Sequence, residues 1–147
     1  RHGSWDVIYT CQSSKILSKV QPSLQGMGGI LGGFQCDVLK DMEEGGESTV
    51  FQQRLSDILQ DRPLSAVVHS LAYAPNIRTT PLLQSTREDF LLAQEISAYS
   101  LIQVARQAKD FFPSRAKNEE KADCTGSITA LSYLGATRAI PGYHAMG

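Results

Sequence analysis

Four short apolar segments recur along this chain and alternate with longer segments whose apolar residues repeat at helical spacing. Continuous apolar runs of strand length are typical of strands buried on both faces of a parallel sheet. Parallel strands need crossover connections, which are usually helices and right-handed. The alternation therefore predicts an α/β fold with a parallel sheet and flanking helices. The segments expected to be strands are Trp5–Thr10, Gly33–Val38, Leu64–Ser70 and Ser127–Ser132.

Two segments carry the helical pattern. In residues 48–60 apolar side chains recur at intervals of three or four, and Pro63 then closes the connection. A longer helix is predicted to begin at Ser85 or Thr86, either of which is a suitable N-cap, and to run to about Phe112. We find no internal repeat and no linker that would divide the 147 residues into separate domains.

The charge balance argues against two classes of partner. Fourteen Lys and Arg against fifteen Asp and Glu give a net charge of −1, and no basic cluster is present, so nucleic-acid binding is not expected. No apolar run approaches the ~20 residues that a membrane-spanning helix needs. The chain opens at Arg1 with no signal or transit segment, and we expect its natural N-terminus to be missing.

The cysteines and histidines give no support for a disulfide framework or a metal site. Cys11, Cys36 and Cys124 are odd in number, and their spacing matches neither a disulfide scaffold nor a zinc site. We expect reduced thiols, with Cys36 a buried apolar residue rather than a nucleophile. The histidines lie far apart with no carboxylate at ligand spacing. They are His2, His69 and His144.

Two segments fit no regular element. Residues 26–33 are rich in glycine, but a dinucleotide fingerprint needs G-x-G-x-x-G between a strand and a helix. Here Leu31 takes the place of the third glycine and a strand follows, so we expect a flexible turn leading into that strand. Residues 114–125 carry charges of both signs, which is typical of a surface loop rather than a partner-binding patch.

Ligands of open parallel sheets bind beyond the carboxyl ends of the strands, where small or polar residues follow in this chain. Asp37 at such an end could bind a ligand or cap a helix, and both interpretations stay open. Residues 70–75 permit a close backbone approach, but they would equally suit a turn.

Two tyrosines ten residues apart, Tyr133 and Tyr143, follow the last predicted strand. Two phenols at one strand edge can donate hydrogen bonds to a developing oxyanion, as reduction of a conjugated carbonyl requires. Such a proton donor needs a nearby cation to tune it, and none follows before Gly147. A plain surface or core role for both tyrosines is the alternative.

Several motifs in one order then point to a family. The most specific is SYLGATRAIPGYHAMG at residues 132–147, supported by CDV at 36–38, HSLAYAP at 69–75 and EISAYS at 95–100. Together they resemble the enoyl-acyl-carrier-protein reductases, a branch of the short-chain dehydrogenase/reductase superfamily. The ten-residue gap between the tyrosines separates this branch from other short-chain reductases, which usually have Ser and then Tyr-x-x-x-Lys.

The resemblance implies a Rossmann-like sheet, NADH as cofactor, and trans-2-enoyl thioesters on acyl carrier protein as substrates in fatty acid biosynthesis. Hydride would reach the β-carbon while Tyr143 stabilises the enolate, with Tyr133 nearby and Met146 lining the same pocket. NADH is favoured over NADPH because the segment after Thr10 offers Lys15 but no arginine for a 2′-phosphate. The cofactor-binding residues implied by the resemblance are Gln12, Asp37, Val38, Ser70, Leu71, Ala72, Ile96 and Ser132.

Compared with the family, the chain resembles an internal fragment of one Rossmann-fold domain, residues 1–147, truncated at both ends. The family's first strand and glycine-rich phosphate turn should precede Trp5, and its lysine should follow Tyr143 by seven residues. The resemblance implies a homotetramer that associates through the helix at 88–112. It implies a soluble enzyme, cytoplasmic in a bacterium or in a plastid or apicoplast stroma in a eukaryote. A catalytically incompetent fragment and another short-chain dehydrogenase/reductase are the alternatives.

Overall fold

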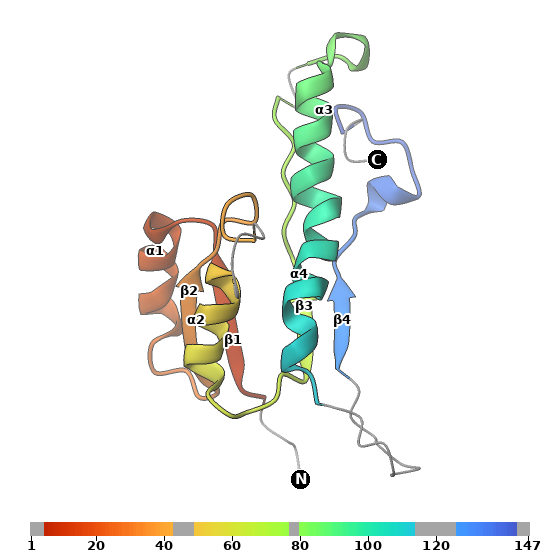
Figure 1. Cartoon of the computed structure of the whole chain (residues 1–147). Helices are drawn as coiled ribbons and strands as arrows, with labels where there is room; N and C mark the ends of the chain where they lie inside the picture. The colour runs from red at the N-terminus through yellow and green to blue at the C-terminus, as the bar shows by residue number, and fades with distance from the viewer. Residues whose placement is uncertain (1–4, 43–48, 77–79, 114–125, 144–147) are drawn as a thin grey trace, which may run out of the picture. The chain divides into compact units, whose positions relative to one another are not determined.

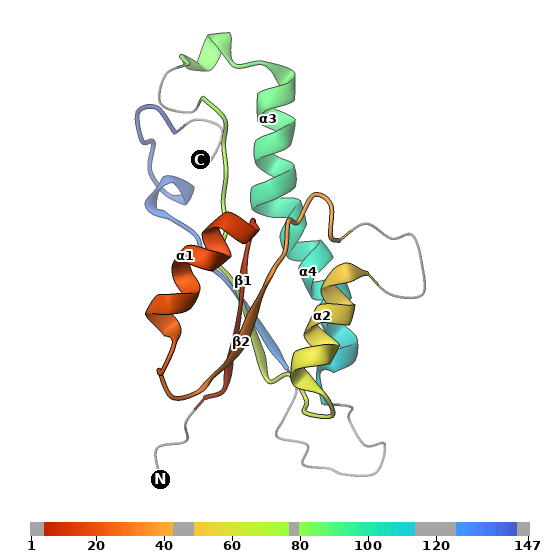
Figure 2. The same ribbon diagram turned by 90° about the vertical axis from the view of Figure 1, so that its left-hand side faces the viewer.

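The computed structural model describes residues 5–42, 49–76, 80–113 and 126–143 (Figures 1 and 2). The chain forms two compact units, Arg1–Arg62 and Pro63–Gly147, and each is described by itself. Within the described residues no helix is both long and apolar enough to cross a membrane. The charged segment 114–125, predicted to be a surface loop, lies outside the described residues.

The first unit is a parallel strand pair with a helix on each side. Strand β1 (Val7–Cys11) pairs with β2 (Ile30–Gln35), and helix α1 (Ser14–Leu24) connects them. Helix α2 (Val50–Leu59) follows β2 in the chain. Figure 2 shows α1 and α2 on opposite sides of the pair, as in a sheet covered on both faces.

Helix α1 is an element that the sequence analysis missed. Ser13 caps its N-terminus, with its hydroxyl accepting from the Ile16 N–H at 3.4 Å. Ile16, Val20 and Leu24 recur every four residues and would have indicated a helix. The sequence pattern was weak because Pro22 lies within the helix. In the structure none of the helical residues is fully buried.

The glycine-rich segment divides between a turn and a strand. Gly26 and Gly29 have φ of 85° and 83°, a conformation that glycine adopts without strain, so the predicted turn is confirmed. The strand begins at Ile30 and ends at Gln35, however, so the prediction of a strand over residues 33–38 was three residues late.

The reason for that error lies in two glycines inside β2. A Cβ on Gly33 would collide with the ring of Tyr9 on β1, and a Cβ on Gly32 would contact Ile58 of α2 at 3.5 Å. Glycine inside a strand marks a close approach of neighbouring groups. Because residues 26–33 are rich in glycine, composition alone predicted that residues 30–32 belong to the turn and not to the strand.

Helix α2 confirms the helix predicted over residues 48–60, and it supplies three of the buried apolar side chains of the first unit. Thr49 and Gln52 form a capping box, with the Gln52 N–H donating to Thr49 Oγ1 at 3.2 Å and the Thr49 N–H donating to Gln52 Oε1 at 3.1 Å. Phe51 packs against Phe34 of β2 with ring centroids 5.8 Å apart. The buried apolar side chains of this unit are Phe34, Cys36, Val38, Met42, Phe51, Leu55 and Leu59.

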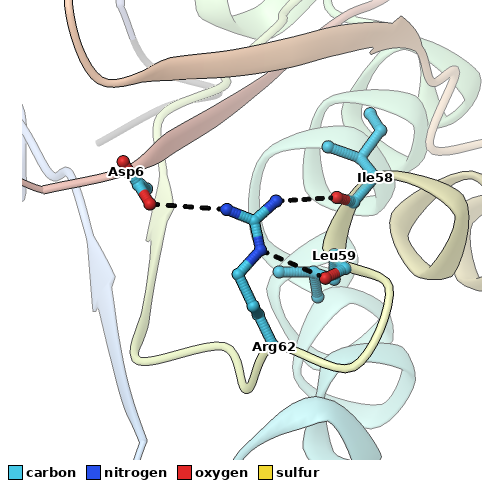
Figure 3. Close-up of polar contacts among 4 residues, drawn as sticks. All are labelled: Asp6, Ile58, Leu59 and Arg62. Atoms are coloured by element: carbon cyan, nitrogen blue, oxygen red, sulfur yellow. Dashed lines mark hydrogen bonds and ion pairs between the residues drawn. The ribbon is translucent and has the colours of Figure 1, made fainter.

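Arg62 closes the C-terminal end of α2 (Figure 3). Its Nη2 donates to the carbonyl of Ile58 at 3.2 Å and its Nε to the carbonyl of Leu59 at 3.3 Å. Its Nη1 also pairs with Asp6 Oδ2 at 3.4 Å. Because the ion pair is exposed, the main contribution of Arg62 is to satisfy helix-end carbonyls that lack partners within the helix.

The second unit joins a parallel strand pair to one long helical segment. Strand β3 (Ala66–His69) pairs with β4 (Ser127–Ala130). The helical segment confirms the prediction of a long helix ending near Phe112, and Thr86 is its N-cap, accepting from the Asp89 N–H at 3.0 Å. Its parts are α3 (Arg87–Gln94), the π-helical turn η2 (Glu95–Tyr99), α4 (Ser100–Ala108) and the 3₁₀ turn η3 (Lys109–Phe111). Two further 3₁₀ turns are η1 (Leu82–Gln84) and η4 (Leu134–Ala136).

All four predicted strands are present and each pair is parallel, although each strand differs from its predicted bounds. Hydrogen bonds among the described residues join them as two pairs, β1–β2 and β3–β4. In the second pair Val68 is 65% exposed and Ile128 is 37% exposed. Parallel strands are usually covered on both faces, so these strands expose more apolar surface than is typical.

Candidate cofactor and active site

The carboxyl ends of β1 and β2 meet at one edge of the first unit. The N–H of Cys36 donates to the carbonyl of Cys11 at 2.9 Å, and Gln12 and Asp37 are the next residues along the two segments. The backbone thus brings these two predicted cofactor residues to the same edge, where ligands of parallel sheets bind.

Asp37 forms a turn at this edge. Its Oδ1 accepts from the Leu39 N–H at 3.1 Å, while its own N–H donates to Asp41 Oδ2 at 2.6 Å. Among the described residues the other carboxylate oxygen, Asp37 Oδ2, has no hydrogen-bond partner. Asp37 can therefore cap the turn with Oδ1 and still offer Oδ2 to a ligand. Asp37 therefore caps a turn and not the helix that one interpretation of the sequence offered. The neighbouring Val38 is 9% exposed.

Cys36 is a buried thiol, as predicted. Burial, followed by the negative charges of Asp41 and Asp37, raises the pKa of Cys36 to about 12. A thiol with so high a pKa is protonated at neutral pH and is a poor nucleophile. Cys11 is free and half-buried.

The carboxyl ends of β3 and β4 form a second edge. The N–H of Leu131 donates to the carbonyl of His69 at 2.9 Å, and Ser70 and Ser132 follow these residues. Two more of the predicted cofactor residues, Leu71 and Ala72, continue from Ser70. The extended segment that contains them runs beside α3 (Figures 1 and 2). This edge thus gathers four of the predicted positions within one unit.

Ile96, the remaining predicted cofactor residue, lies in the π-helical turn η2. There the Ser100 N–H donates to the carbonyl of Glu95, five residues earlier, and the Ser100 hydroxyl donates to the carbonyl of Ile96 at 2.6 Å. In an α-helix the Ser100 N–H would donate to the carbonyl of Ile96. Here the Ser100 hydroxyl donates to that carbonyl instead. Single π turns inside α-helices are frequent at functional sites. The helical periodicity did not predict this one.

Ser100 also joins the helix to β3. His69 Nε2 and Ser100 Oγ are 2.8 Å apart, and both residues are buried. Because the only proton of the Ser100 hydroxyl goes to Ile96, His69 Nε2 is the donor and carries the hydrogen. Burial lowers the pKa of His69, which favours the neutral ring. No local sequence pattern predicted this contact of His69, since its partner is 31 residues away.

Tyr133 and Tyr143 contact each other at the end of the described chain. Their ring centroids are 5.7 Å apart at 44°, and the Tyr133 hydroxyl donates to the main-chain carbonyl of Tyr143 at 3.4 Å. Gly135 lies against the Tyr133 ring, where a Cβ would overlap the ring and hydroxyl. The predicted proximity of the two phenols is thus present. Met146 lies outside the described residues.

A shallow apolar groove runs along the outer face of the long helical segment. Residues spaced three or four apart line it, although none of the predicted site residues does so. Leu91, Tyr99 and Ile102 in it are 46%, 45% and 54% exposed. The lining residues are Leu91, Gln94, Glu95, Ala98, Tyr99 and Ile102. Within the described parts of the chain, no group of three or more His, Cys, Asp or Glu side chains could hold a metal ion.

Comparison with known proteins decides the family. Residues 2–147 match the family described as enoyl-(acyl carrier protein) reductase. The chain belongs to this family. Enoyl-acyl-carrier-protein reductases are oxidoreductases of fatty acid biosynthesis, and the resemblance found in the motifs is thereby confirmed.

Individual relatives agree with the assignment. The chain is 38% identical over 117 residues to the enoyl-[acyl-carrier-protein] reductase [NADH] FabI of Neisseria meningitidis, an alignment covering 78% of this chain and 39% of that protein. It is 40% identical over 116 residues to the [NADPH] FabI of Staphylococcus aureus, covering 78% and 39%. It is 30% identical over 142 residues to the [NADH] FabI of Aquifex aeolicus, covering 95% and 46%. The chain thus spans less than half the length of these relatives.

Solved structures show the fold. The Aquifex aeolicus reductase superposes with a TM-score of 0.70 at 30% identity, covering 94% of this chain and 48% of that one. The reductase of Anaplasma phagocytophilum, solved in complex with NAD, superposes with a TM-score of 0.73 at 28% identity, covering 97% and 48%. The predicted Rossmann-like α/β fold is confirmed.

Proposed function

We propose that this chain is the central part of an NADH-dependent enoyl-acyl-carrier-protein reductase that reduces trans-2-enoyl thioesters in type II fatty acid biosynthesis. The observation that carries the proposal is the contact between Tyr133 and Tyr143, just beyond the carboxyl end of β4, in a member of the reductase family. A phenol beside a nucleotide-binding edge can stabilise the negative oxygen that a reduced enoyl thioester develops.

We assign the residues at each strand edge to a separate part of the dinucleotide. The uncommitted Oδ2 of Asp37 can accept from the adenine amino group, with Val38 beside the ring and Gln12 near the ribose. Ser70, Leu71 and Ala72 offer small side chains and backbone along the ribose and diphosphate. We assign Ile96 and Ser132 to the nicotinamide end.

NADH is our proposed reductant, since α1 presents Lys15 but no arginine near the end of β1 for a 2′-phosphate. The relatives divide on this point, because the Neisseria protein is named for NADH and the Staphylococcus protein for NADPH. A direct comparison of the two nucleotides therefore tests this part of the proposal.

In the proposed mechanism the cofactor supplies a hydride to the β-carbon of the enoyl thioester. The Tyr143 hydroxyl donates a hydrogen bond to the thioester carbonyl oxygen and stabilises the negative charge as the double bond becomes an enolate. The α-carbon then takes up a proton, which completes the saturated thioester. Tyr133 packs on the Tyr143 ring and donates to its carbonyl, and both contacts hold Tyr143 in place.

We further propose that the complete reductase contains segments before and after these 147 residues. Dinucleotide-binding sheets have the strand order 3-2-1-4-5-6. Removing strands 1 and 6 from this order leaves the pairs 3-2 and 4-5, and this chain has two parallel pairs, β1–β2 and β3–β4. The exposure of Val68 at 65% also supports additional covering structure. A lysine seven residues after Tyr143 would supply the cation that tunes its phenol.

For partners and location we propose acyl carrier protein as the carrier of the substrate, a homotetramer, and the cytoplasm of a bacterium. The apolar groove on the long helical segment supports self-association, because exposed Leu91, Tyr99 and Ile102 form one continuous helical face. The relatives compared above are bacterial, which favours the bacterial cytoplasm over a plastid.

The test is NADH consumption with crotonyl-acyl carrier protein, followed at the nicotinamide absorbance band. The complete reading frame should be assayed beside the 147-residue chain, with NADPH and acetoacetyl-acyl carrier protein as alternative reactants. We expect the complete protein to oxidise NADH with the enoyl substrate and the isolated chain to be inactive. Preference for the acetoacetyl substrate would indicate another short-chain reductase. If the complete reading frame also gives an inactive protein, the alternative that the chain is catalytically incompetent is favoured.

A further inference from the structure

Two of the sequence motifs, HSLAYAP and EISAYS, are joined by hydrogen bonds in the structure. The Ser97 hydroxyl accepts from the main-chain N–H of Tyr73 at 3.0 Å and donates to the main-chain carbonyl of the same residue at 2.9 Å. One side chain thus contacts both polar backbone groups of Tyr73. Three residues further along the helical segment, Ser100 holds His69 at 2.8 Å.

These two contacts bracket the extended segment Ser70–Ala72. His69 fixes its start from inside the buried core, and Tyr73 fixes its end at the π-helical turn η2. The segment has no regular secondary structure of its own, so its backbone position depends on such tethers. Ser97 lies next to Ile96, in the same turn.

We propose that Ser97 is a positioning residue: through Tyr73 its hydroxyl holds Ser70–Ala72 in the conformation that binds NADH. This inference rests on the proposed function, which assigns those residues to the ribose and diphosphate. Fixing a segment in its binding conformation raises affinity because less conformational freedom is lost when the ligand binds. We assign Ser97 no direct role at the reacting atoms.

Ser97 is a better test position than Ser100. Ser100 is fully buried, so its replacement would disturb the core along with the segment. Ser97 is half-buried and its contacts with Tyr73 lie at the surface, so Ser97→Ala removes the tether at little cost in stability. Ser97→Thr restores a hydroxyl, and Ser56→Ala removes an exposed serine hydroxyl from α2 as a matched control.

The experiment uses the complete reductase and two measurements. Amide hydrogen exchange of residues 70–74 without cofactor reports whether the tether exists, and steady-state kinetics report KM for NADH and kcat separately. A hydrogen bond worth about 1 kcal/mol corresponds to roughly five-fold in an equilibrium constant. For Ser97→Ala we expect faster exchange at Tyr73 and a KM for NADH raised about five-fold with kcat within two-fold. We expect near-normal values for Ser97→Thr and Ser56→Ala.

The outcomes separate this inference from the proposed function. If the wild-type protein oxidises NADH but Ser97→Ala leaves its KM unchanged, the positioning role is overturned and the proposed function stands. An equal rise in KM for Ser97→Thr, or a fall in kcat alone, also contradicts positioning through the hydroxyl. If the wild-type protein binds no NADH, the proposed function fails and the inference fails with it, whatever the exchange rate at Tyr73.

Discussion

The Tyr133 hydroxyl donates to the main-chain carbonyl of Tyr143 at 3.4 Å, with the two rings in contact at a centroid distance of 5.7 Å. In our proposed mechanism this contact gives the two phenols different roles. The hydroxyl of Tyr133 is engaged with the backbone, so in our account Tyr133 supports the position of Tyr143. We propose the acid function for Tyr143.

This division predicts unequal effects of removing the two hydroxyls in the complete reductase. Tyr143→Phe should lower kcat roughly 10²-fold because it removes a donor to the developing oxyanion, while KM for NADH changes little. Tyr133→Phe should cost less than about ten-fold in kcat, since it removes one hydrogen bond of support. Tyr9→Phe, in β1, is the control. Equal losses for Tyr133 and Tyr143 would contradict the assignment.

Gly135 should tolerate no side chain, because a Cβ there would overlap the Tyr133 ring. Gly135→Ala is expected to displace Tyr133, to lower the free energy of unfolding by about 1–3 kcal/mol and to reduce kcat. Gly28→Ala is the matched control, since nothing lies within 4 Å of a Cβ at Gly28. Urea unfolding and steady-state assays measure both effects, and normal behaviour of Gly135→Ala would show that the Tyr133 ring can move freely.

The buried contact between His69 and Ser100 predicts a pH dependence of stability. Burial lowers the pKa of His69 from its usual 6.5, so the unfolded chain binds a proton at higher pH than the folded chain does. The contribution of neutral His69 to the free energy of unfolding is therefore fully present above about pH 6.5 and is lost as the pH falls through the folded-state pKa of His69.

Urea unfolding between about pH 7 and about pH 5 measures this loss. In His69→Gln the amide nitrogen can still donate to Ser100 but does not titrate, so the loss of stability on acidification should be smaller. An identical pH dependence in the wild type and His69→Gln would exclude His69 as its source.

If the apolar groove on the helical segment is the surface through which copies of the protein associate, a charge placed in it should disrupt assembly. Ile102→Asp places a charge in the groove and should reduce the mass of the complete reductase from that of the proposed tetramer, as measured by light scattering. Leu83→Asp is the control, because Leu83 is 97% exposed and does not line the groove. A tetramer that persists in Ile102→Asp would place the interface elsewhere.

Local patterns accounted for much of the fold. The apolar spacing of α2, the cap at Thr86 and the four strand-length runs each carry their signal within a few residues. The start of β2 at Ile30 was missed because the glycines that follow it suggest a turn, and their fit depends on Tyr9 and Ile58 from other elements. Helix α1 was missed because Pro22 lies within it, and proline inside a helical pattern argues against a helix.

For the candidate site, the strand-end positions followed from topology and from the family motifs. The contacts that join those positions did not, because they connect residues distant in sequence. Ser97 with Tyr73 is separated by 24 residues and His69 with Ser100 by 31. The π-helical turn also depends on the Ser100 hydroxyl reaching Ile96, which the helical periodicity alone does not reveal.

The most direct test of the central claim is the position of the transferred hydrogen. The complete reductase should be given crotonyl-acyl carrier protein and NADH carrying deuterium at the transferable position of the nicotinamide, and the product should be examined by NMR. We predict one deuterium at the β-carbon of the butyryl thioester and a solvent-derived proton at the α-carbon. Deuterium at the α-carbon, or unchanged crotonyl thioester, would contradict the account.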